Sequence, residues 1–152
     1  MNYVQAIIIA IIEGITEFLP ISSTGHMAIT SAFMGIHTDA FTKLFEIVIQ
    51  FGAILSVVVL YWKKFFDFKK LSFYIKLIIA IIPALVFGAL LKNYIEQLLE
   101  KPLIIALVMF AGGILLLFVD KWFKHPEITR EEDITNKQAL VIGFYQVLAI
   151  VF

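Results

Sequence analysis

Two carboxylates lie inside an apolar stretch near the start of the sequence, at Glu13 and Glu17. Residues four apart lie on the same face of a helix, so these two side chains should point in one direction. A carboxylate inside a membrane costs about 2.5 kcal/mol or more, which makes it a candidate for function by default. Two such groups raise each other's pKa unless a cation lies between them. The spacing therefore favours a site for a hard divalent cation or an acid–base pair.

Three hydroxyl residues follow this acidic pair. Pro20 disfavours helical geometry at Leu19, so the first helix should end there. Ser22, Ser23 and Thr24 come next, and these residue types commonly precede the first turn of a helix. If a helix restarts at this point, its free N–H groups and its dipole form a site for an anion.

Gly25 and His26 complete the segment. Gly25 allows close approach of the backbone to a ligand, and His26 lies within reach of Ser23 on a helix face. Carboxylates, a hydroxyl, a histidine and free N–H groups are together the groups that phosphoryl transfer uses. Taken singly, the glutamates could be an ion relay of a transporter, the hydroxyls a helix cap, and the histidine a packing residue. Their occurrence together in residues 13–26 favours a site.

The composition places these residues in a membrane. Of the 152 residues, 61% are hydrophobic and only 16% are charged, and the mean hydropathy is +0.96. Soluble domains have about 45–50% apolar and about 25% charged residues, so a soluble globular enzyme and a disordered protein are excluded. Twelve basic residues balance twelve acidic ones, so no net charge attracts a nucleic acid. The absence of cysteine excludes disulfides and thiolate metal sites.

Apolar runs of about 20 residues, the length that crosses a bilayer, divide the chain. The runs that qualify are Leu44–Trp62, Phe73–Leu91 and Leu103–Val119, while Ala139–Phe152 begins another, and Val4–Ile21 is long enough but contains the acidic pair. The apolar piece Met27–Ile36 is too short to span and predicts a re-entrant or half-depth helix beside a polar cavity. We therefore expect an all-α integral membrane protein.

The distribution of lysines predicts the orientation. Lysines cluster in residues 63–72 and 120–138, whereas in the intervening 92–102 loop two lysines are offset by two glutamates. The positive-inside rule places the two lysine-rich segments in the cytoplasm, so residues 22–43 should lie near the outer face. Glu46 and Gln50, near the outer end of their span, could extend the site or form hydrogen bonds between helices.

Several stretches carry a resemblance to a known family. Residues 13–26 read EGITEFLPISSTGH, which resembles the first signature of the undecaprenyl-diphosphate phosphatases of the bacitracin-resistance type. Residues 45–54 resemble the next block of this family, and residues 143–149 resemble the lead-in to its second signature. The resemblance implies a polytopic helical bundle of two related halves, each with a re-entrant or broken helix, in the bacterial plasma membrane. It also implies an active site on the outer side.

The implied activity is hydrolysis of undecaprenyl diphosphate to the monophosphate and phosphate. This step recycles the lipid carrier of peptidoglycan synthesis and confers bacitracin resistance. By resemblance, Glu13 and Glu17 are expected to act in acid–base catalysis or to bind a metal ion, with Mg²⁺ or Ca²⁺ as the ion. Ser23 is the candidate nucleophile, and His26 is a candidate acid, base or competing nucleophile. Substrate contacts are expected from Ser22, Thr24, Gly25 and Gln50.

The expected partners are therefore a long-chain isoprenyl diphosphate lipid and the membrane, with no nucleic acid, and association into a homo-oligomer is left open. The family's second signature, Pro-Gly-x-Ser-Arg-Ser-Gly, should begin where Phe152 stands, and its arginine is the expected clamp on the diphosphate. Arg130 is the only arginine, and it lies in the predicted cytoplasmic loop. We therefore expect residues 1–152 to be one membrane domain, a C-terminally truncated piece of impaired activity.

Two other interpretations remain at this stage. A transporter or lipid flippase could use Glu13 and Glu17 as an ion-coupling pair, because repeated halves with broken helices are also typical of transporters. A non-functional fragment is the third interpretation. The hydroxyl–glycine–histidine cluster favours hydrolysis, since ion coupling does not need it.

Overall fold

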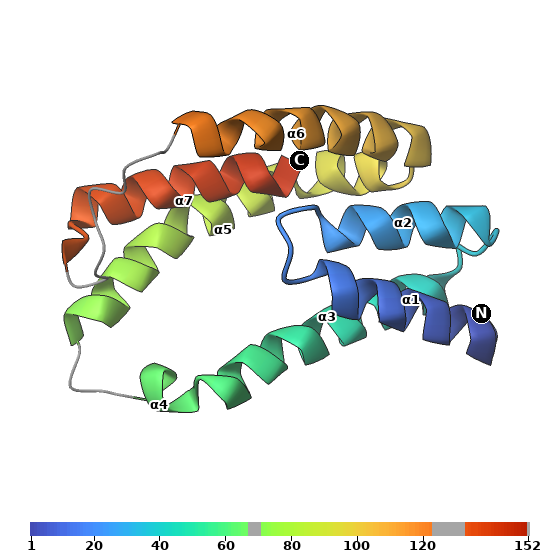
Figure 1. Cartoon of the computed structure of the whole chain (residues 1–152), viewed down its shortest axis with the longest axis horizontal. Helices are drawn as coiled ribbons and strands as arrows, with labels where there is room; N and C mark the ends of the chain where they lie inside the picture. Colours follow the sequence, from blue (N-terminus) through green and yellow to red (C-terminus); the bar gives the residue numbers. More distant parts are fainter. Residues whose placement is uncertain (67–70, 123–132, 152) are drawn as a thin grey trace. The chain divides into compact units, whose positions relative to one another are not determined.

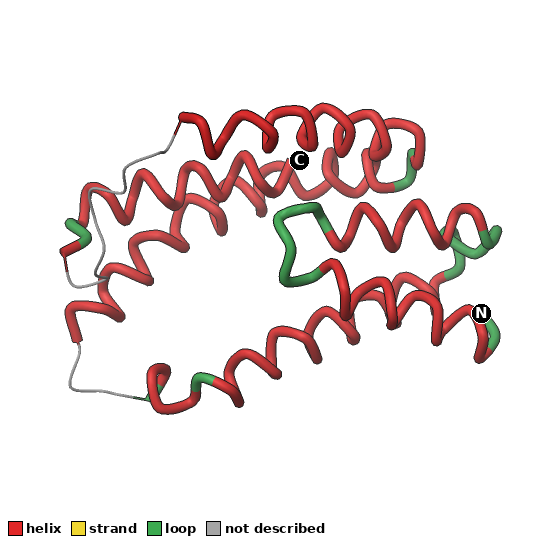
Figure 2. Tube along the Cα trace, viewed as in Figure 1, coloured by secondary structure: helices red, strands yellow, loops and turns green. Residues whose placement is uncertain are grey.

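The computed structural model describes residues 1–66, 71–122 and 133–151, and within these ranges the chain is helical without any strand (Figures 1 and 2). This confirms the all-α prediction. The helices are α1 (Tyr3–Thr16), α2 (Ser23–Phe33), α3 (Ala40–Leu60), α4 (Trp62–Phe65), α5 (Leu71–Leu99), α6 (Pro102–Trp122) and α7 (Asn136–Val151).

Helices α3, α5 and α6 supply three stretches that are long and apolar enough to cross a membrane. These stretches are Ala40–Leu60, Leu71–Leu98 and Pro102–Val119, which confirms the three predicted spans with shifted ends. Large apolar side chains along them are exposed, among them Leu60 at 75% and Leu103 at 74%. Apolar surface on this scale is stable only against lipid. The chain is therefore a multi-pass membrane protein.

The prediction that residues 92–102 form a loop is wrong for most of that segment, because α5 continues to Leu99. Residues 92–99 are polar enough to end a hydropathy run, but they include the good helix formers lysine, glutamate, glutamine and leucine. Lys92 and Glu96 also form an ion pair of 3.8 Å one turn apart. The break comes only at Glu100 and Lys101, just before Pro102 begins α6.

Helix α1 is shorter than the apolar run that contains it. Asn2 caps its start in a reciprocal arrangement, since the side chain of each of Asn2 and Gln5 accepts a hydrogen bond from the other's backbone N–H. The helix ends at Thr16, so the run Val4–Ile21 is not one spanning helix. The predicted interruption before Pro20 is confirmed, and it falls three residues earlier than Leu19. Fourteen residues are too few to cross a bilayer.

Helix α2 confirms the predicted restart of a helix after the proline. Ser22 is its N-cap, and the 11-residue helix ends at Phe33, followed by a turn in which Gly35 has a φ of 68°. A left-handed φ favours glycine because glycine has no Cβ. The helix is half the length of a span, as the interpretation of Met27–Ile36 required.

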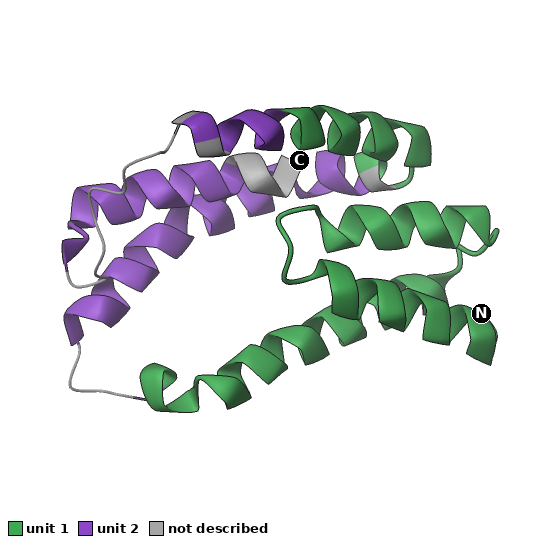
Figure 3. Ribbon diagram, viewed as in Figure 1, with its two compact units in different colours: residues 1–65, 97–114 green, residues 66–96, 115–152 purple. Residues whose placement is uncertain are grey.

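The chain forms two compact units (Figure 3). The first comprises Met1–Phe65 and Gln97–Ile114, and the second comprises Phe66–Glu96 and Leu115–Phe152, so two of the three boundaries fall within helices, one in α5 and one in α6. In the first unit α1, α2 and α3 pack against one another. In the second, α7 packs closely on α5. A Cβ at Gly143 would lie 2.9 Å from Pro83 Cγ, and the Phe87 and Phe144 rings meet edge-to-face at 6.1 Å.

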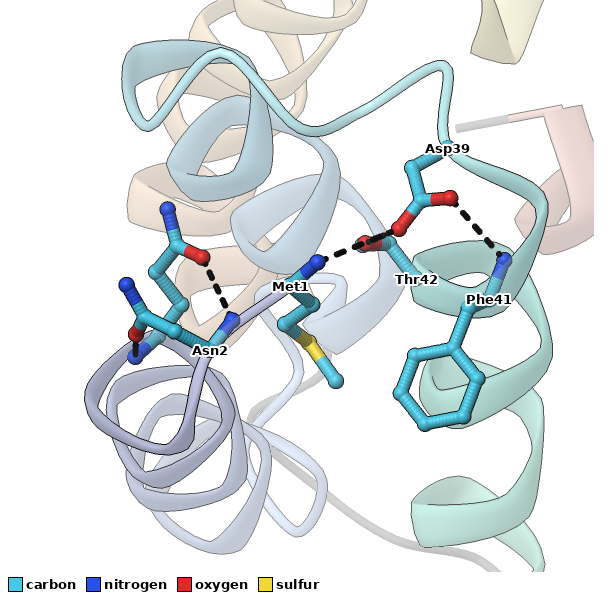
Figure 4. A network of polar contacts seen from close by, with 6 residues as sticks. Met1, Asn2, Asp39, Phe41 and Thr42 are labelled. Atoms are coloured by element: carbon cyan, nitrogen blue, oxygen red, sulfur yellow. Dashed lines mark hydrogen bonds and ion pairs between the residues drawn. The ribbon is translucent and has the colours of Figure 1, made fainter.

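Asp39 ties the start of α3 to the start of the chain (Figure 4). As the N-cap of α3, its carboxylate accepts hydrogen bonds from the Phe41 N–H at 3.4 Å and from the Thr42 hydroxyl at 3.1 Å. The same carboxylate lies 3.4 Å from the α-amino group of Met1. Thr42 is completely buried, so this contact is shielded from the surroundings on one side.

We expect the stabilisation from Asp39 to depend on pH. The Thr42 hydroxyl, as hydrogen-bond donor, holds the pKa of Asp39 below its ordinary value. A carboxyl group with a lowered pKa in the folded state stabilises the fold above its unfolded pKa of about 3.9, and this contribution is lost as pH falls through the folded value. Asp39→Asn, which keeps a capping side chain but no charge, should lower the thermal midpoint by a few degrees at pH 7.

This difference in midpoint between the parent and Asp39→Asn should shrink progressively below about pH 4, because Asp39 is protonated first in the unfolded chain and then, at its lower folded-state pKa, in the folded chain. Thermal unfolding in detergent at pH 7 and pH 3 measures it, with the exposed Asp133→Asn as the matched control. A difference as large at pH 3 as at pH 7 would contradict the assignment of the stabilisation to the charge of Asp39.

Candidate functional site

The connection between α1 and α2 brings the two ends of the 13–26 segment together (Figure 1). Glu17 follows α1 in helical conformation, with φ −61° and ψ −37°, and its N–H bonds to the Glu13 carbonyl at 2.9 Å. The two glutamates therefore share a face, as the spacing predicts. Ser23, the first residue of α2, donates its hydroxyl hydrogen to Glu17 Oε2. A carboxylate that accepts a serine proton is the arrangement of a nucleophile with its general base.

Glu13 is buried and unsatisfied. Its side chain is 2% exposed, and neither carboxylate oxygen has a hydrogen-bond partner among the described residues. The groups that act on it electrostatically are Glu17, Ser23 and Glu46, and two of these are themselves acidic. An isolated buried carboxylate is too costly to stay charged, so this group is either protonated or neutralised by a cation.

The first turn of α2 presents free backbone donors. Ser22 has a left-handed φ of 62°, uncommon for a residue with a side chain, and its Oγ accepts a hydrogen bond from the Gly25 N–H at 3.3 Å. Within the described residues, the N–H groups of Ser23 and Thr24 have no acceptor. Free N–H groups next to a buried acid and a serine hydroxyl form a concave donor set for an oxyanion.

His26 is held by the same turn. Its Nδ1 lies 2.9 Å from the Ser22 carbonyl oxygen, and its backbone N–H bonds to that oxygen at 3.1 Å. A carbonyl only accepts, so Nδ1 must carry the hydrogen, which leaves Nε2 as the acceptor in the neutral ring. This hydrogen bond fixes the orientation of the imidazole ring. It also leaves Nε2 without a hydrogen in the neutral ring, so that Nε2 can accept a proton.

Gln50 joins this turn from α3. Its Nε2 donates to the Thr24 hydroxyl at 2.7 Å, so the structure shows the second of the two roles considered for it, a hydrogen bond between helices, while its contact with substrate stays a prediction. Because Thr24 accepts this bond, its own hydroxyl hydrogen remains available to a ligand. Glu46, one turn before Gln50, is half-buried, and its Oε1 has no partner among the described residues.

The acidic residues could supply two ligands of a divalent cation, but not a complete set of protein ligands. Throughout the described ranges, no three histidine, aspartate or glutamate side chains converge closely enough to hold a metal. Glu13 and Glu17 offer two carboxylates, and both oxygens of Glu13 are free of other partners. Mg²⁺ commonly binds through one or two carboxylates together with water and substrate phosphates, so the pair fits this mode.

One neighbour of the site, Met109 of α6, was not predicted from the sequence. Its thioether sulfur occupies the space beside Gly25 where a Cβ would lie, within the first unit. Arg130 and most of the predicted cytoplasmic loop at 120–138 lie outside the described residues, as does Phe152. The predicted cytoplasmic loop 63–72 is described except for residues 67–70.

Fold and site together define a polytopic helical membrane protein with a buried acidic and hydroxyl-bearing site at a helix N-terminus. Residues 6–152 match the family described as Bacitracin resistance protein BacA, and the chain belongs to this family.

Curated relatives carry the name undecaprenyl-diphosphatase. That of Flavobacterium johnsoniae is 56% identical over 152 residues, which cover 99% of this chain and 57% of the relative. That of Flavobacterium psychrophilum is 57% identical over 151 residues, covering 99% and 56%, and that of Bdellovibrio bacteriovorus is 45% identical over 153 residues, covering 99% and 57%. The chain thus spans a little over half the length of these relatives.

Proposed function

We propose that this chain carries the phosphatase site of a membrane enzyme that hydrolyses undecaprenyl diphosphate to the monophosphate and inorganic phosphate. The hydrogen bond from the Ser23 hydroxyl to Glu17 at the N-terminus of α2 carries this proposal. Membership of the family and the names of its relatives support the substrate. Hydrolysis would return the lipid carrier to peptidoglycan synthesis and would lower sensitivity to bacitracin, which is the resistance named in the family description.

In the proposed reaction, Ser23 Oγ attacks the terminal phosphorus of the diphosphate. The hydroxyl proton passes to Glu17, and the bond between this phosphorus and the bridging oxygen breaks, so that the isoprenyl monophosphate leaves. Water then attacks the phosphoserine, releasing phosphate and returning the proton to Ser23. Glu17 acts as base in the first step and its protonated form regenerates the serine in the second.

The other residues of the first turn would stabilise the charge on the phosphoryl group and accept a proton from water. The N–H groups of Ser23 and Thr24 and the Thr24 hydroxyl would donate to the equatorial phosphoryl oxygens, where negative charge develops. Ser22, as N-cap, and Gln50, through Thr24, orient these donors. His26 Nε2 would accept a proton from the attacking water in the second step and release it to solvent, which returns the site to its starting protonation state.

Glu13 and Glu17 would hold a divalent cation, Mg²⁺ or Ca²⁺. When bound, such an ion neutralises the acidic pair and offsets charge on the phosphoryl oxygens. We also propose that the site lies on the outer side of the bacterial plasma membrane, which the distribution of the lysine-rich segments supports.

Removal of the cation should therefore abolish most of the activity. We expect a chelator to lower the rate of phosphate release about a hundredfold, and added Mg²⁺ or Ca²⁺ to restore it. Glu13→Gln should raise the cation concentration needed for half-maximal rate by about tenfold or more, since it replaces the carboxylate whose two oxygens are free. Glu96→Gln, an exposed glutamate on α5, serves as the control. Full activity in the chelator would exclude the cation site.

The direct experiment measures phosphate release from undecaprenyl diphosphate in detergent micelles. It compares the 152-residue chain with a chimera in which the chain continues with the remaining C-terminal part of the Flavobacterium johnsoniae relative. Phosphate release by the chimera, absent in its Ser23→Ala/Glu17→Gln version, supports the proposal. A chimera that folds but releases no phosphate overturns it. The 152-residue chain in the same assay tests the sequence-based expectation of impaired activity.

The contacts and comparisons provide no observation that favours the transporter interpretation. Ion coupling through the two glutamates would need neither the bond from Ser23 to Glu17 nor the free N–H groups of α2.

A further inference from the structure

We propose that Met109 of α6 is a positioning residue for the first turn of α2, and this assignment deepens the proposed function, on which its catalytic part rests. Nothing in the signature segments points to Met109, which lies 83 residues beyond His26 in the sequence. The proposal starts from the space beside Gly25.

Gly25 has no free space for a side chain. A Cβ at this position would collide with Met109 Sδ and would lie 3.2 Å from Met109 Cγ. The same Cβ would lie 3.1 Å from Ser22 Oγ, the oxygen that caps the helix. Gly25 is buried and Met109 is half-buried, so the thioether fills the position that a larger residue 25 would occupy.

The first turn of α2 needs support from outside because its own geometry is strained. Ser22 holds a left-handed φ of 62°, and its capping bond to the Gly25 N–H is long at 3.3 Å. Strained backbone of this kind persists only where the surrounding structure fixes it. Gln50 holds the turn from α3 through a polar bond to Thr24, and Met109 supports it from α6 through apolar packing.

Methionine suits this position. Its unbranched, polarisable side chain fills irregular gaps, and here it lies directly on backbone. If Met109 were shortened, Gly25 would be free to move toward α6. The N–H groups of Ser23 and Thr24 and the Ser23 hydroxyl would move with the turn, and misplacement by about 1 Å can lower a catalytic rate about a hundredfold.

Hydrogen–deuterium exchange of the 152-residue chain in detergent tests the contact without requiring activity. Met109→Ala should raise exchange of the hydrogen-bonded backbone amides of residues 25–27 about tenfold, with exchange in α3 unchanged. Met109→Leu, which conserves the volume of the side chain, should show the same exchange rate at these amides as the parent chain. Met34→Ala, at the other end of α2, is the matched control. Gly25→Ala should also raise exchange, because its Cβ would collide with the Met109 side chain. In the double variant Gly25→Ala/Met109→Ala this collision is absent, so most of the rise should be reversed.

Two results would overturn the proposal: unchanged exchange at residues 25–27 in Met109→Ala, or an equal rise in every helix, which would indicate a merely structural role. In the active chimera described above, Met109→Ala should lower kcat about tenfold or more with KM within about twofold. Altered exchange with unaltered kcat overturns the positioning role alone. An inactive chimera with locally raised exchange overturns the proposed function and leaves the packing of Met109 on Gly25 standing.

Discussion

Ser23→Ala is expected to lower kcat for phosphate release about a thousandfold or more in the active chimera, with little change in KM. The hydroxyl is the proposed attacking group, and it already donates to Glu17 in the absence of substrate. Without this hydroxyl, the enzyme would retain only its hydrogen-bond donors and its contacts with the substrate. These groups alone supply a small part of the rate acceleration.

Ser31→Ala is the matched control for Ser23→Ala. Ser31 lies on the same helix, is 1% exposed, and donates its hydroxyl to the Ala28 carbonyl at 3.1 Å; the acidic group that it neighbours is Glu46, which has no catalytic role in the proposal. Its replacement should leave kcat within about threefold of the parent value. His26→Ala should lower kcat about tenfold to a hundredfold, since it removes an acid–base group. The reverse order, with His26→Ala inactive and Ser23→Ala active, would assign the nucleophile to the histidine.

Glu17→Gln is expected to lower kcat about a hundredfold to a thousandfold. The amide oxygen of glutamine can still accept the Ser23 hydroxyl, so the hydrogen bond and the packing are kept. What is lost is the capacity to take the proton when Oγ attacks phosphorus, together with one carboxylate of the proposed cation pair, so kcat is compared at saturating Mg²⁺. The loss should therefore appear in kcat, while the thermal midpoint stays close to that of the parent.

Two comparisons sharpen this test. Glu100→Gln, at an exposed ion pair with Lys43, carries the same change of charge without contact with the site and should leave kcat unchanged. Glu17→Asp shortens the side chain but keeps the base, so it should recover part of the rate. If Glu17→Gln keeps full activity, Glu17 is not the base.

The local part of the site could be predicted from the sequence because its residues follow one another closely. Glu13 and Glu17 share a face by helix periodicity, and Pro20 requires a break after them. Ser22 then caps the next helix, so a 14-residue segment contains both sides of a hairpin and brings Ser23 to Glu17. Gln50 was also found, because its spacing from Glu46 placed it on a polar face of an otherwise apolar span.

Contacts between distant and ordinary residues could not be predicted in this way. Met109 is one apolar residue among many on α6, and only the packing of that helix on Gly25 distinguishes it. Asp39 follows the short apolar piece Met27–Ile36 in the sequence, but its ion pair with the α-amino group of Met1 depends on how α1 and α3 pack. The length of α5 was underestimated because hydropathy, rather than helix propensity, decided its end.

Two of the three boundaries between the units lie inside the continuous helices α5 and α6, and this affects how the protein loses structure. Helix formation is cooperative along the backbone, so disorder that starts in one unit can spread through α5 or α6 into the other. The sequence contains two tryptophans, and each unit holds one, Trp62 in the first and Trp122 in the second. Fluorescence from single-tryptophan variants can therefore follow the unfolding of each unit separately. Coincident unfolding transitions would show that the two units unfold cooperatively, and separate transitions would show that they unfold independently.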